Sequence, residues 1–553
     1  MFTQKYAPRY LISCDLSDLP TEHVPAVVVG SGIAGSRAAL EVARDHEVLL
    51  LTKENFKESN TNYALGGIAA ALSPHDTPER HAEDTIDAGK GLVDEELVHE
   101  AVREGQERVR EMIEWGADFD EEEGEIDFTR EGGHSERRIL HAGGDKTGEE
   151  LASTLEEEIK RTDRVEVREE VFVIDLLTDS DGCCGVLIQN GSGERKLIIS
   201  PAVILCSGGA GQLYRETTNP GVTTGDGLAM AYRAGAQLRD LEFYQFHPTT
   251  LYIAGSGRSL ISESVRGEGA KLIDRNGHRF MEEYHPDGEL APRDIVSRGI
   301  VKHISETDAT CVYLDLSDME PDFVHERFPR LSELCQEFQI DVATDPVPVH
   351  PSAHYLIGGI QTDHQGQTTI PGLYAAGEVA STGFHGANRL GSNSLLEGLV
   401  FGCRCGQSAR DRISGSFDPD LNDVSGFDES KRSPEFIDLT DMRDSVQSLN
   451  WRQCGIIRSE EGIRDALYKL NFWCSYLLDR EMNGPEGWEV QNLFTLSRLM
   501  SYQTLCREES RGVHYRSDYP DTRDEEFGHS QTLNRSAFPD RLEEAVQIPE
   551  QSP

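Results

Sequence analysis

A glycine-rich turn near the start of the chain constrains the fold more than any other segment. The turn reads GSGIAG at residues 30–35 and follows an apolar run at residues 25–29 that is typical of a buried parallel strand. Residues 33–44 then have helical spacing, and residues 47–52 predict a second buried strand. The first glycine permits the tight turn, the second lets the backbone approach a pyrophosphate, and the third allows the helix to pack closely on the strand. The segment therefore predicts a doubly wound α/β domain with a site for a dinucleotide.

The residue at the end of the second strand departs from the commonest dinucleotide pattern. An acidic side chain at that position usually binds the ribose diol of a nicotinamide cofactor. Here the position holds Lys53. This departure counts against a nicotinamide-dependent dehydrogenase.

The charge of the chain excludes two classes of partner. The chain has 553 residues, with 53 basic against 98 acidic side chains and a net charge of −45. Nucleic acid and anionic membrane surfaces would repel such a protein, so we expect neither as a partner. Because 37% of the residues are hydrophobic and the apolar segments are patterned, the chain is expected to fold rather than stay disordered.

The basic residues are themselves unusual, since only 11 of the 53 are lysine. An acid-rich, lysine-poor surface is typical of a protein solvated in high salt, where ions screen the repulsion between like charges. We therefore expect a halophilic protein.

Targeting and metal signals are not found in the sequence. No run of about 20 apolar residues predicts a membrane span, and residues 1–20 do not resemble a signal peptide. The eleven cysteines are scattered, and only the pairs at 183–184 and 403–405 are close together. Neither pair has the spacing of a zinc or iron–sulfur site. We expect a cytoplasmic protein with reduced thiols and no bound metal.

The length predicts roughly three or four domains, and changes in pattern suggest where they divide. Helices with acidic faces are expected at 77–120, a hairpin-like β insertion at 165–205 and a helix near 225–235. Segments at 237–350 are shorter and more mixed. A polar linker follows near 414–436, then amphipathic helices, and about thirty charged residues that we expect to be loosely ordered. The divisions expected are an α/β dinucleotide-binding domain in two parts (1–236 and 351–425), an inserted domain (237–350) and a C-terminal helical domain (426–553).

Seven further segments, taken in this order, are very specific together. In chain order they are SNTNYALGG at 59–67, REGGH at 130–134, QFHPT at 245–249, SESVRGEG at 262–269, APRD at 291–294, AHY at 353–355 and HGANRLGSNSLLE at 385–397. With the glycine turn, this set resembles the succinate dehydrogenase/fumarate reductase flavoprotein family. The resemblance covers residues 25 to about 520, including ESRGVH at 509–514. It implies the α/β FAD-binding domain split by an inserted α+β capping domain, with a helical domain after it.

The resemblance also implies FAD as the cofactor, with the pyrophosphate at the glycine turn, Lys53 near the adenosine and residues 60–67 along the flavin. Relatives that attach FAD covalently do so through a histidine at the position of Asn60, so non-covalent FAD is expected here. A haem-binding CxxCH segment is not found either, which excludes the flavocytochrome type. The implied cofactor residues are Gly30, Ser31, Gly32, Ile33, Ala34, Gly35, Lys53, Asn60, Thr61, Asn62, Tyr63, Ala64, Leu65, Gly66, Gly67, Asp226, Glu378, Ser394 and Leu395.

A four-carbon dicarboxylate requires a cation or donor at each end. The resemblance assigns His354 and Arg389 to one carboxylate, and His247 with the hydroxyl of Ser262 to the other. Relatives usually have threonine at the position of Ser262, and serine keeps that hydroxyl but loses the methyl group. The competing interpretation of Ser262 is a simple helix cap.

Arg293 matches the proton-transferring arginine of the fumarate reductases, and Glu263 with Arg266 matches the relay beside it. The alternative for Glu263 and Arg266 is a structural ion pair. Glu131 matches a glutamate of the members that oxidise L-aspartate, where it would attract the substrate ammonium. Its alternative is a solvated surface residue in a glycine-rich loop. His134 and His141 have no assigned role.

The activity implied is oxidation of L-aspartate to iminoaspartate, the first step towards quinolinate and NAD. O2 or fumarate would reoxidise the flavin, and quinolinate synthase is a possible partner for the product. Two other functions stay open at this point. One is a soluble fumarate reductase or succinate-oxidising flavoprotein, and the other is a non-catalytic flavoprotein scaffold or a subunit of an iron–sulfur complex.

Overall fold

The computed structural model describes residues 8–13, 16–415, 437–478 and 480–536, with three single residues between 416 and 436. Most of the linker expected at 414–436 and the last part of the charged tail, 537–553, lie outside the described residues. None of the helices in the described part of the chain has the length and apolar character that a membrane span requires.

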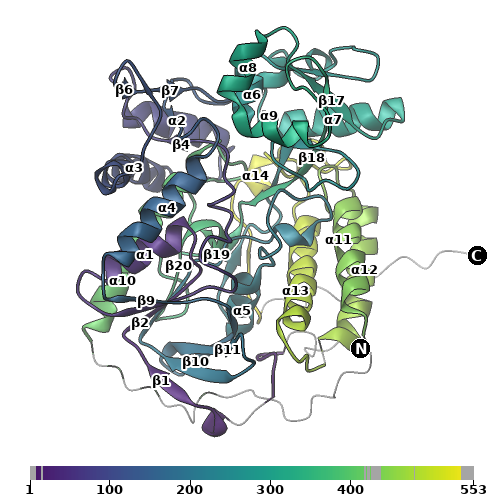
Figure 1. The fold of residues 1–553 in the computed structure, drawn as a ribbon. Helices are drawn as coiled ribbons and strands as arrows, with labels where there is room; N and C mark the ends of the chain where they lie inside the picture. Colours follow the sequence, from purple (N-terminus) through teal and green to yellow (C-terminus); the bar gives the residue numbers. More distant parts are fainter. Residues whose placement is uncertain are drawn as a thin grey trace, which may run out of the picture.

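A five-stranded parallel sheet forms the centre of the molecule, in the order β20-β13-β2-β3-β9 (Figure 1). The two strands predicted around the glycine turn are confirmed as β2 (Ala26–Val29) and β3 (Val48–Leu51), and they pair in register along their length. The remaining strands are β9 (Val165–Arg168), β13 (Ala202–Leu205) and β20 (Leu373–Ala375).

The side chains of this sheet alternate between two apolar cores, because successive residues of a strand point to opposite faces. Val28 and Leu50 are buried against a helical layer, whereas Val27 and Leu49 are buried on the other face. The helical layer consists of α1 (Ile33–Val42), α3 (Glu95–Trp115), α4 (Thr147–Lys160) and α10 (Asn393–Ile413), with α2 (Pro78–Ala88) packed on α3.

A mixed sheet of order β1-β12-β11-β10, in which β1 and β12 are parallel and the other pairs are antiparallel, covers the other face in place of a second layer of helices. It contains the middle part of the β insertion that the turn signals predict at 165–205, whereas β9 and β13, at the two ends of that range, belong to the central sheet. Its inner side chains, such as Val186 and Ile198, are fully buried and join the same core as Val27, so the sheet provides the apolar cover that this face needs. The strands are β1 (Thr21–His23), β10 (Val171–Asp179), β11 (Gly182–Asn190) and β12 (Arg195–Ile199).

The mixed segment between the two parts of the central sheet forms a unit with its own apolar core, at the top of Figure 1. A four-stranded antiparallel sheet of order β15-β18-β17-β16 supports it. The strands are β15 (Tyr244–Leu251), β16 (Lys271–Ile273), β17 (Val312–Asp315) and β18 (Val347–Leu356). The helices are α6 (Glu263–Gly267), α7 (Arg293–Thr307), α8 (Pro321–Arg327) and α9 (Pro329–Gln336).

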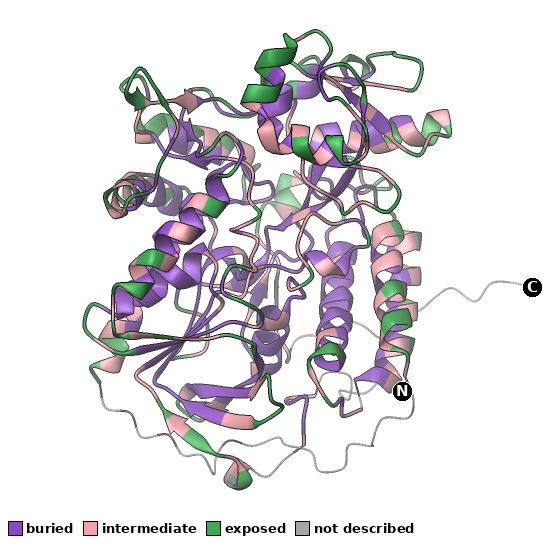
Figure 2. Ribbon diagram, in the orientation of Figure 1, coloured by how far each residue is buried: buried purple, intermediate pink, exposed green. Residues whose placement is uncertain are grey.

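The C-terminal helices pack beside α5 (Asp226–Ala234), the helix predicted near 225–235. They are α11 (Leu439–Gln453), α12 (Glu460–Leu477), α13 (Pro485–Cys506) and the short α14 (Asp524–Phe527). Figure 2 shows α13 buried over most of its length, whereas α12 is buried on one side only. Helix α13 is therefore the central member of this layer, in contact with α5, α11 and α12.

Short strands complete the described part of the chain. A four-stranded sheet, β21-β19-β14-β22, brings the tail back to the body of the protein; its strands are β14 (Leu238–Arg239), β19 (Gly359–Gln361), β21 (Ala380–Ser381) and β22 (Thr532–Leu533). Two smaller sheets contain β4 (Ile68–Ala69), β7 (Phe128–Thr129) and β8 (Ile139–Leu140), and β5 (Glu121–Glu122) with β6 (Glu125–Ile126).

Candidate active site

A single pocket extends from the end of β3, past the glycine turn, to the side chains presented by β15, β18 and α7. It brings together most of the residues that the sequence singles out. At the cofactor end it is lined by Gly30, Ser31, Gly32, Ile33, Ala34, Lys53, Asn60, Thr61, Tyr63, Ala64, Leu65, Gly66, Gly67, Asp226, Glu378, Ser394 and Leu395. At the other end it is lined by Glu131, His247, Ser262, Glu263, Arg293, His354 and Arg389.

Three of the predicted residues do not line this pocket. A Cβ atom added to Gly35 would lie 1.9 Å from the carbonyl oxygen of Gly30, so Gly35 permits the close packing of α1 on the turn. Asn62 is turned away from the pocket, with Oδ1 buried and without a hydrogen-bond partner. Arg266 lies behind Glu263, with 3.7 Å between Nη2 and Oε1, so it can act only through that carboxylate.

Two helices begin at the cofactor end of the pocket without a cap from the residue before them, although the backbone N–H of Ile33 in α1 donates to the hydroxyl of Thr61 at 3.0 Å. Helix α1 starts after Gly32 and helix α10 starts after Ser392, and neither residue caps its helix through a side-chain hydrogen bond. The backbone N–H groups of such helix starts bind anionic groups. Gly30 has φ +109°, and a Cβ atom there would lie 2.2 Å from the carbonyl oxygen of Cys206, so only glycine fits the turn. The chain therefore fits a dinucleotide such as FAD.

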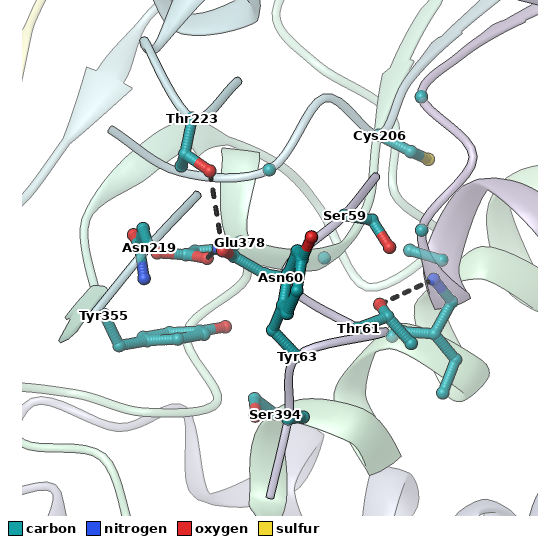
Figure 3. Close-up of a pocket in the computed structure, with 18 of the residues that line it drawn as sticks. Ser59, Asn60, Thr61, Tyr63, Cys206, Asn219, Thr223, Tyr355, Glu378 and Ser394 are labelled. Carbon is teal, nitrogen blue, oxygen red and sulfur yellow. Dashed lines mark hydrogen bonds between the residues drawn. The ribbon is translucent and has the colours of Figure 1, made fainter. Parts of the chain in front are cut away.

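Polar side chains from several segments meet in the middle of the pocket (Figure 3). The amide of Asn60 donates to Glu378 Oε2 at 3.0 Å and accepts from the hydroxyl of Thr223 at 3.4 Å. Glu378 Oε1 accepts from the backbone N–H of Leu356 at 3.0 Å. Burial nevertheless raises the pKa of Glu378 to about 7, because these donors only partly replace water around the carboxylate.

Two arginines converge on one amide at the far end of the pocket. Arg293 Nη1 and Arg389 Nη1 donate to the same oxygen of Gln245, at 3.2 and 3.1 Å. Burial, followed by the charge of Arg293, lowers the pKa of Arg389 to about 10. Two adjacent cations in a buried site favour an anionic ligand, since such a ligand would relieve their repulsion.

The two histidines of the dicarboxylate end lie against each other, with ring centroids 5.3 Å apart. His354 Nδ1 is hydrogen bonded to the hydroxyl of Thr218 at 3.0 Å, and His247 Nδ1 lies within hydrogen-bond distance of the backbone of Thr249. Burial is the main cause that lowers the pKa of both rings well below the usual value, and Arg293 contributes to each. The imidazoles are therefore neutral near pH 7.

Ser262 both caps a helix and lines the pocket. Its oxygen accepts from the backbone N–H of Ser264 at 3.3 Å and from the hydroxyl of Ser264 at 2.8 Å. The helix-cap interpretation is thus confirmed, and the hydroxyl proton of Ser262 stays available for a ligand, because both of these contacts use the oxygen as acceptor.

Glu131 is not a solvated loop residue, since only 4% of its surface is exposed. The hydroxyl of Ser392 donates to Glu131 Oε2 at 2.8 Å. Burial and then the neighbouring Glu263 raise the pKa of Glu131, and Arg293 opposes this effect. A carboxyl group is thus held in the pocket near the two arginines.

Glu263 forms a short ion pair with Arg293. Arg293 Nε donates to Glu263 Oε2 at 2.5 Å. Burial alone would raise the pKa of Glu263, but Arg293 and Arg266 outweigh burial and hold that pKa below its usual value. The three side chains therefore alternate in charge, from Arg293 through Glu263 in the pocket to Arg266, which does not line the pocket.

The two histidines without an assigned role lie outside this pocket. His134 is buried between Arg138 and the backbone of Gly391: Nη1 of Arg138 donates to Nδ1 at 3.2 Å, and Nε2 contacts the carbonyl oxygen of Gly391 at 3.0 Å. His141 contacts the hydroxyl of Thr129 at 2.7 Å. His134 thus supports the loop that carries Ser392.

Comparisons with known proteins agree with this geometry. Residues 26–395 match the family model described as an FAD binding domain, and residues 443–548 match the fumarate reductase flavoprotein C-terminal model. The chain belongs to the succinate dehydrogenase/fumarate reductase flavoprotein family. FAD is therefore its cofactor, and this family has the split α/β domain and the helical C-terminal domain described above.

Two similar curated proteins are L-aspartate oxidases. The chain is 42% identical to the L-aspartate oxidase of Synechocystis, over 91% of this chain and 96% of that protein. It is also 42% identical to the L-aspartate oxidase of Streptomyces coelicolor, over 94% of this chain and 91% of that protein. Among solved structures, a chain of E. coli quinol fumarate reductase superposes with a TM-score of 0.86 at 31% identity, covering 93% of this chain and 95% of that chain.

Proposed function

We propose that this protein oxidises L-aspartate to iminoaspartate. The observation that carries the proposal is Glu131, a buried carboxyl group beside the dicarboxylate-binding arginines of a flavoprotein. Succinate offers no cation for such a group to attract, whereas L-aspartate offers its ammonium group. The similarity to L-aspartate oxidases over more than 90% of the chain supports the same substrate.

Each end of the substrate has its own donors in this proposal. Arg389 and His354 bind one carboxylate, and His247 with the hydroxyl of Ser262 binds the other. The neutral imidazoles contribute N–H donors, so the positive charge of the site comes from the arginines. The shared contact with Gln245 holds the two guanidinium groups in place, which supports orientation as a main source of rate acceleration.

The buried ion pairs of the site transfer the protons. Oxidation removes a hydride from Cα and a proton from the nitrogen, and bound FAD supplies the hydride acceptor. Arg293 lies in the pocket and pairs with Glu263, which in turn faces Arg266, so these side chains form a path for protons between the pocket and the interior of the cap. The step between Arg293 and Glu263 uses a charge-assisted hydrogen bond, and Arg266 adds an ion pair to the same carboxylate at 3.7 Å.

The wider setting is part of the proposal. The FAD is non-covalent, because Asn60 cannot form the bond that a histidine would form. O2 or fumarate takes up the electrons, and quinolinate synthase consumes the iminoaspartate. Free thiols throughout the described residues support a cytoplasmic location, and the acidic surface supports a halophilic origin. The domain divisions proposed are 1–236 with 351–425, 237–350 and 426–553.

A turnover assay tests the proposal. The purified protein is supplied with L-aspartate, D-aspartate or succinate in the presence of O2 or fumarate, and ammonia released from the hydrolysed imine is measured. The proposal predicts ammonia from L-aspartate alone. Oxidation of succinate to fumarate without any reaction of L-aspartate would contradict it and support a succinate-oxidising flavoprotein.

A further inference from the structure

Lys53, at the end of β3, uses all of its hydrogen-bonding capacity inside the protein. Its ammonium group donates to Thr224 Oγ1 at 2.8 Å, to Asp226 Oδ2 at 2.9 Å and to Glu489 Oε1 at 2.7 Å. A lysine has three N–H donors, so these three contacts satisfy them all. Although burial lowers the pKa of Lys53, Asp226 and Glu489 outweigh burial and hold it above the usual value. In this arrangement Lys53 orients its neighbours and has no donor left over for a cofactor.

The carboxylate of Asp226 is held from two sides, with some acceptor capacity left over. Its Oδ2 accepts from Lys53 and from the hydroxyl of Thr224 at 2.7 Å. Its Oδ1 accepts from the amide of Asn492 at 2.7 Å. A carboxylate has about four acceptor positions, so roughly one is left for the hydroxyl of a bound ligand. Asp226 lines the pocket at the end of β3, where this fold places the ribose of a dinucleotide.

One partner of Lys53 and one partner of Asp226 come from α13, in the C-terminal helical layer. Glu489 and Asn492 are three residues apart, which places them on one face of the helix. The second oxygen of Glu489 accepts from Arg443 of α11 at 2.6 Å. The amide of Asn492 is held in one orientation, because its Oδ1 accepts from Arg233 at 2.6 Å. Side chains of α11 and α13 thus hold residues at the cofactor end of the pocket, which the glycine turn begins at residue 30.

We infer that the C-terminal helices complete the adenosine end of the cofactor site, with Glu489 and Asn492 as positioning residues that act through Lys53 and Asp226. This inference rests on the proposed role of Asp226 as a cofactor ligand. It means that FAD affinity depends on the docking of α13, and that FAD in turn stabilises this docking by linkage.

The direction in which a substitution of Glu489 changes the affinity for FAD distinguishes this inference from a general effect of charge. The pyrophosphate of FAD is negatively charged, so removal of a nearby carboxylate should tighten binding if only long-range charge matters. The positioning role predicts the opposite result, because Asp226 loses its fixed partner. Glu489→Gln removes the charge, and Glu489→Asp keeps the charge but shortens the reach. Glu486→Gln removes the same charge from an exposed position on the same helix and is the matched control.

The test measures binding of FAD and of ADP to the full-length apoprotein, by fluorescence titration and competition. The Kd of both ligands should rise about tenfold in Glu489→Gln, which loses the ion pair with Lys53, and in Glu489→Asp, whose shorter side chain no longer reaches Lys53. It should change less than about twofold in Glu486→Gln. Unchanged or tighter binding in the two Glu489 variants, or weaker FAD binding with unchanged ADP binding, would overturn the inference. Asp226→Asn tests the premise separately: unchanged FAD affinity there would refute the ligand role of Asp226, whatever Glu489 does.

Discussion

We predict that the buried carboxyl group of Glu378 makes FAD affinity depend on pH. Burial raises its pKa from 4.5 to about 7, a shift of about 2.5 pH units or roughly 3 kcal/mol against ionisation in the protein without cofactor. The stability contributed by the neutral form is complete below about pH 4.5 and is lost as the pH rises through about 7. A hydroxyl group of FAD that donates to the carboxylate would favour the ionised form. FAD binding should therefore release a proton below pH 7.

The magnitude follows from the same pKa. If only the carboxylate binds FAD, the Kd is inversely proportional to the fraction of Glu378 that is ionised, so with a pKa of about 7 it should be roughly tenfold higher at pH 6 than at pH 8. Fluorescence titration of the apoprotein at several pH values measures this ratio. Glu378→Gln is uncharged at every pH and should lose the difference, while the other titrating groups act equally in both proteins. Equal pH dependence in the wild-type and variant proteins would refute the reasoning.

Three further outcomes are expected. Arg293→Leu should abolish turnover but keep bound FAD, since Arg293 lies at the dicarboxylate end of the pocket; a variant that still oxidises substrate would exclude Arg293 from the reaction. Glu131→Gln should lower kcat/KM for L-aspartate by about 100-fold through the loss of a buried ionic contact, without lowering the affinity for a succinate inhibitor; an equal loss for both ligands would exclude recognition of the ammonium group. Activity should persist or rise in molar salt, where ions screen the acidic surface, and an enzyme most active in dilute buffer would contradict a halophilic origin.

Local patterns in the sequence predicted those elements whose hydrophobic periodicity lies within one short segment. The apolar strands around residues 30–35, the β insertion and the amphipathic face of α12 depend on short-range periodicity, and all three are confirmed. The mixed sheet in place of a second helical layer was not predicted, because the cover of a sheet face depends on contacts between distant segments.

The candidate site shows the same division. Residues inside recognised motifs, such as Glu131 and Arg389, were found in the sequence and line the pocket. Gln245 lies within one of those motifs, but its contact with two arginines becomes visible only in three dimensions. Thr218 and Asn219 also line the pocket, but they lie outside all of the motifs recognised in the sequence. Glu489 reaches Lys53 across 436 residues of sequence, and no local pattern predicts such a pair.

The most direct test of the proposed activity is anaerobic reduction of the bound flavin. Without an acceptor, each enzyme molecule should transfer one pair of electrons from substrate to FAD, and the visible flavin absorbance should bleach. We predict rapid and complete bleaching by L-aspartate and none by succinate at the same concentration. Bleaching by succinate but not by L-aspartate would contradict the proposed function, and no bleaching by any dicarboxylate would show that this flavoprotein does not catalyse such an oxidation.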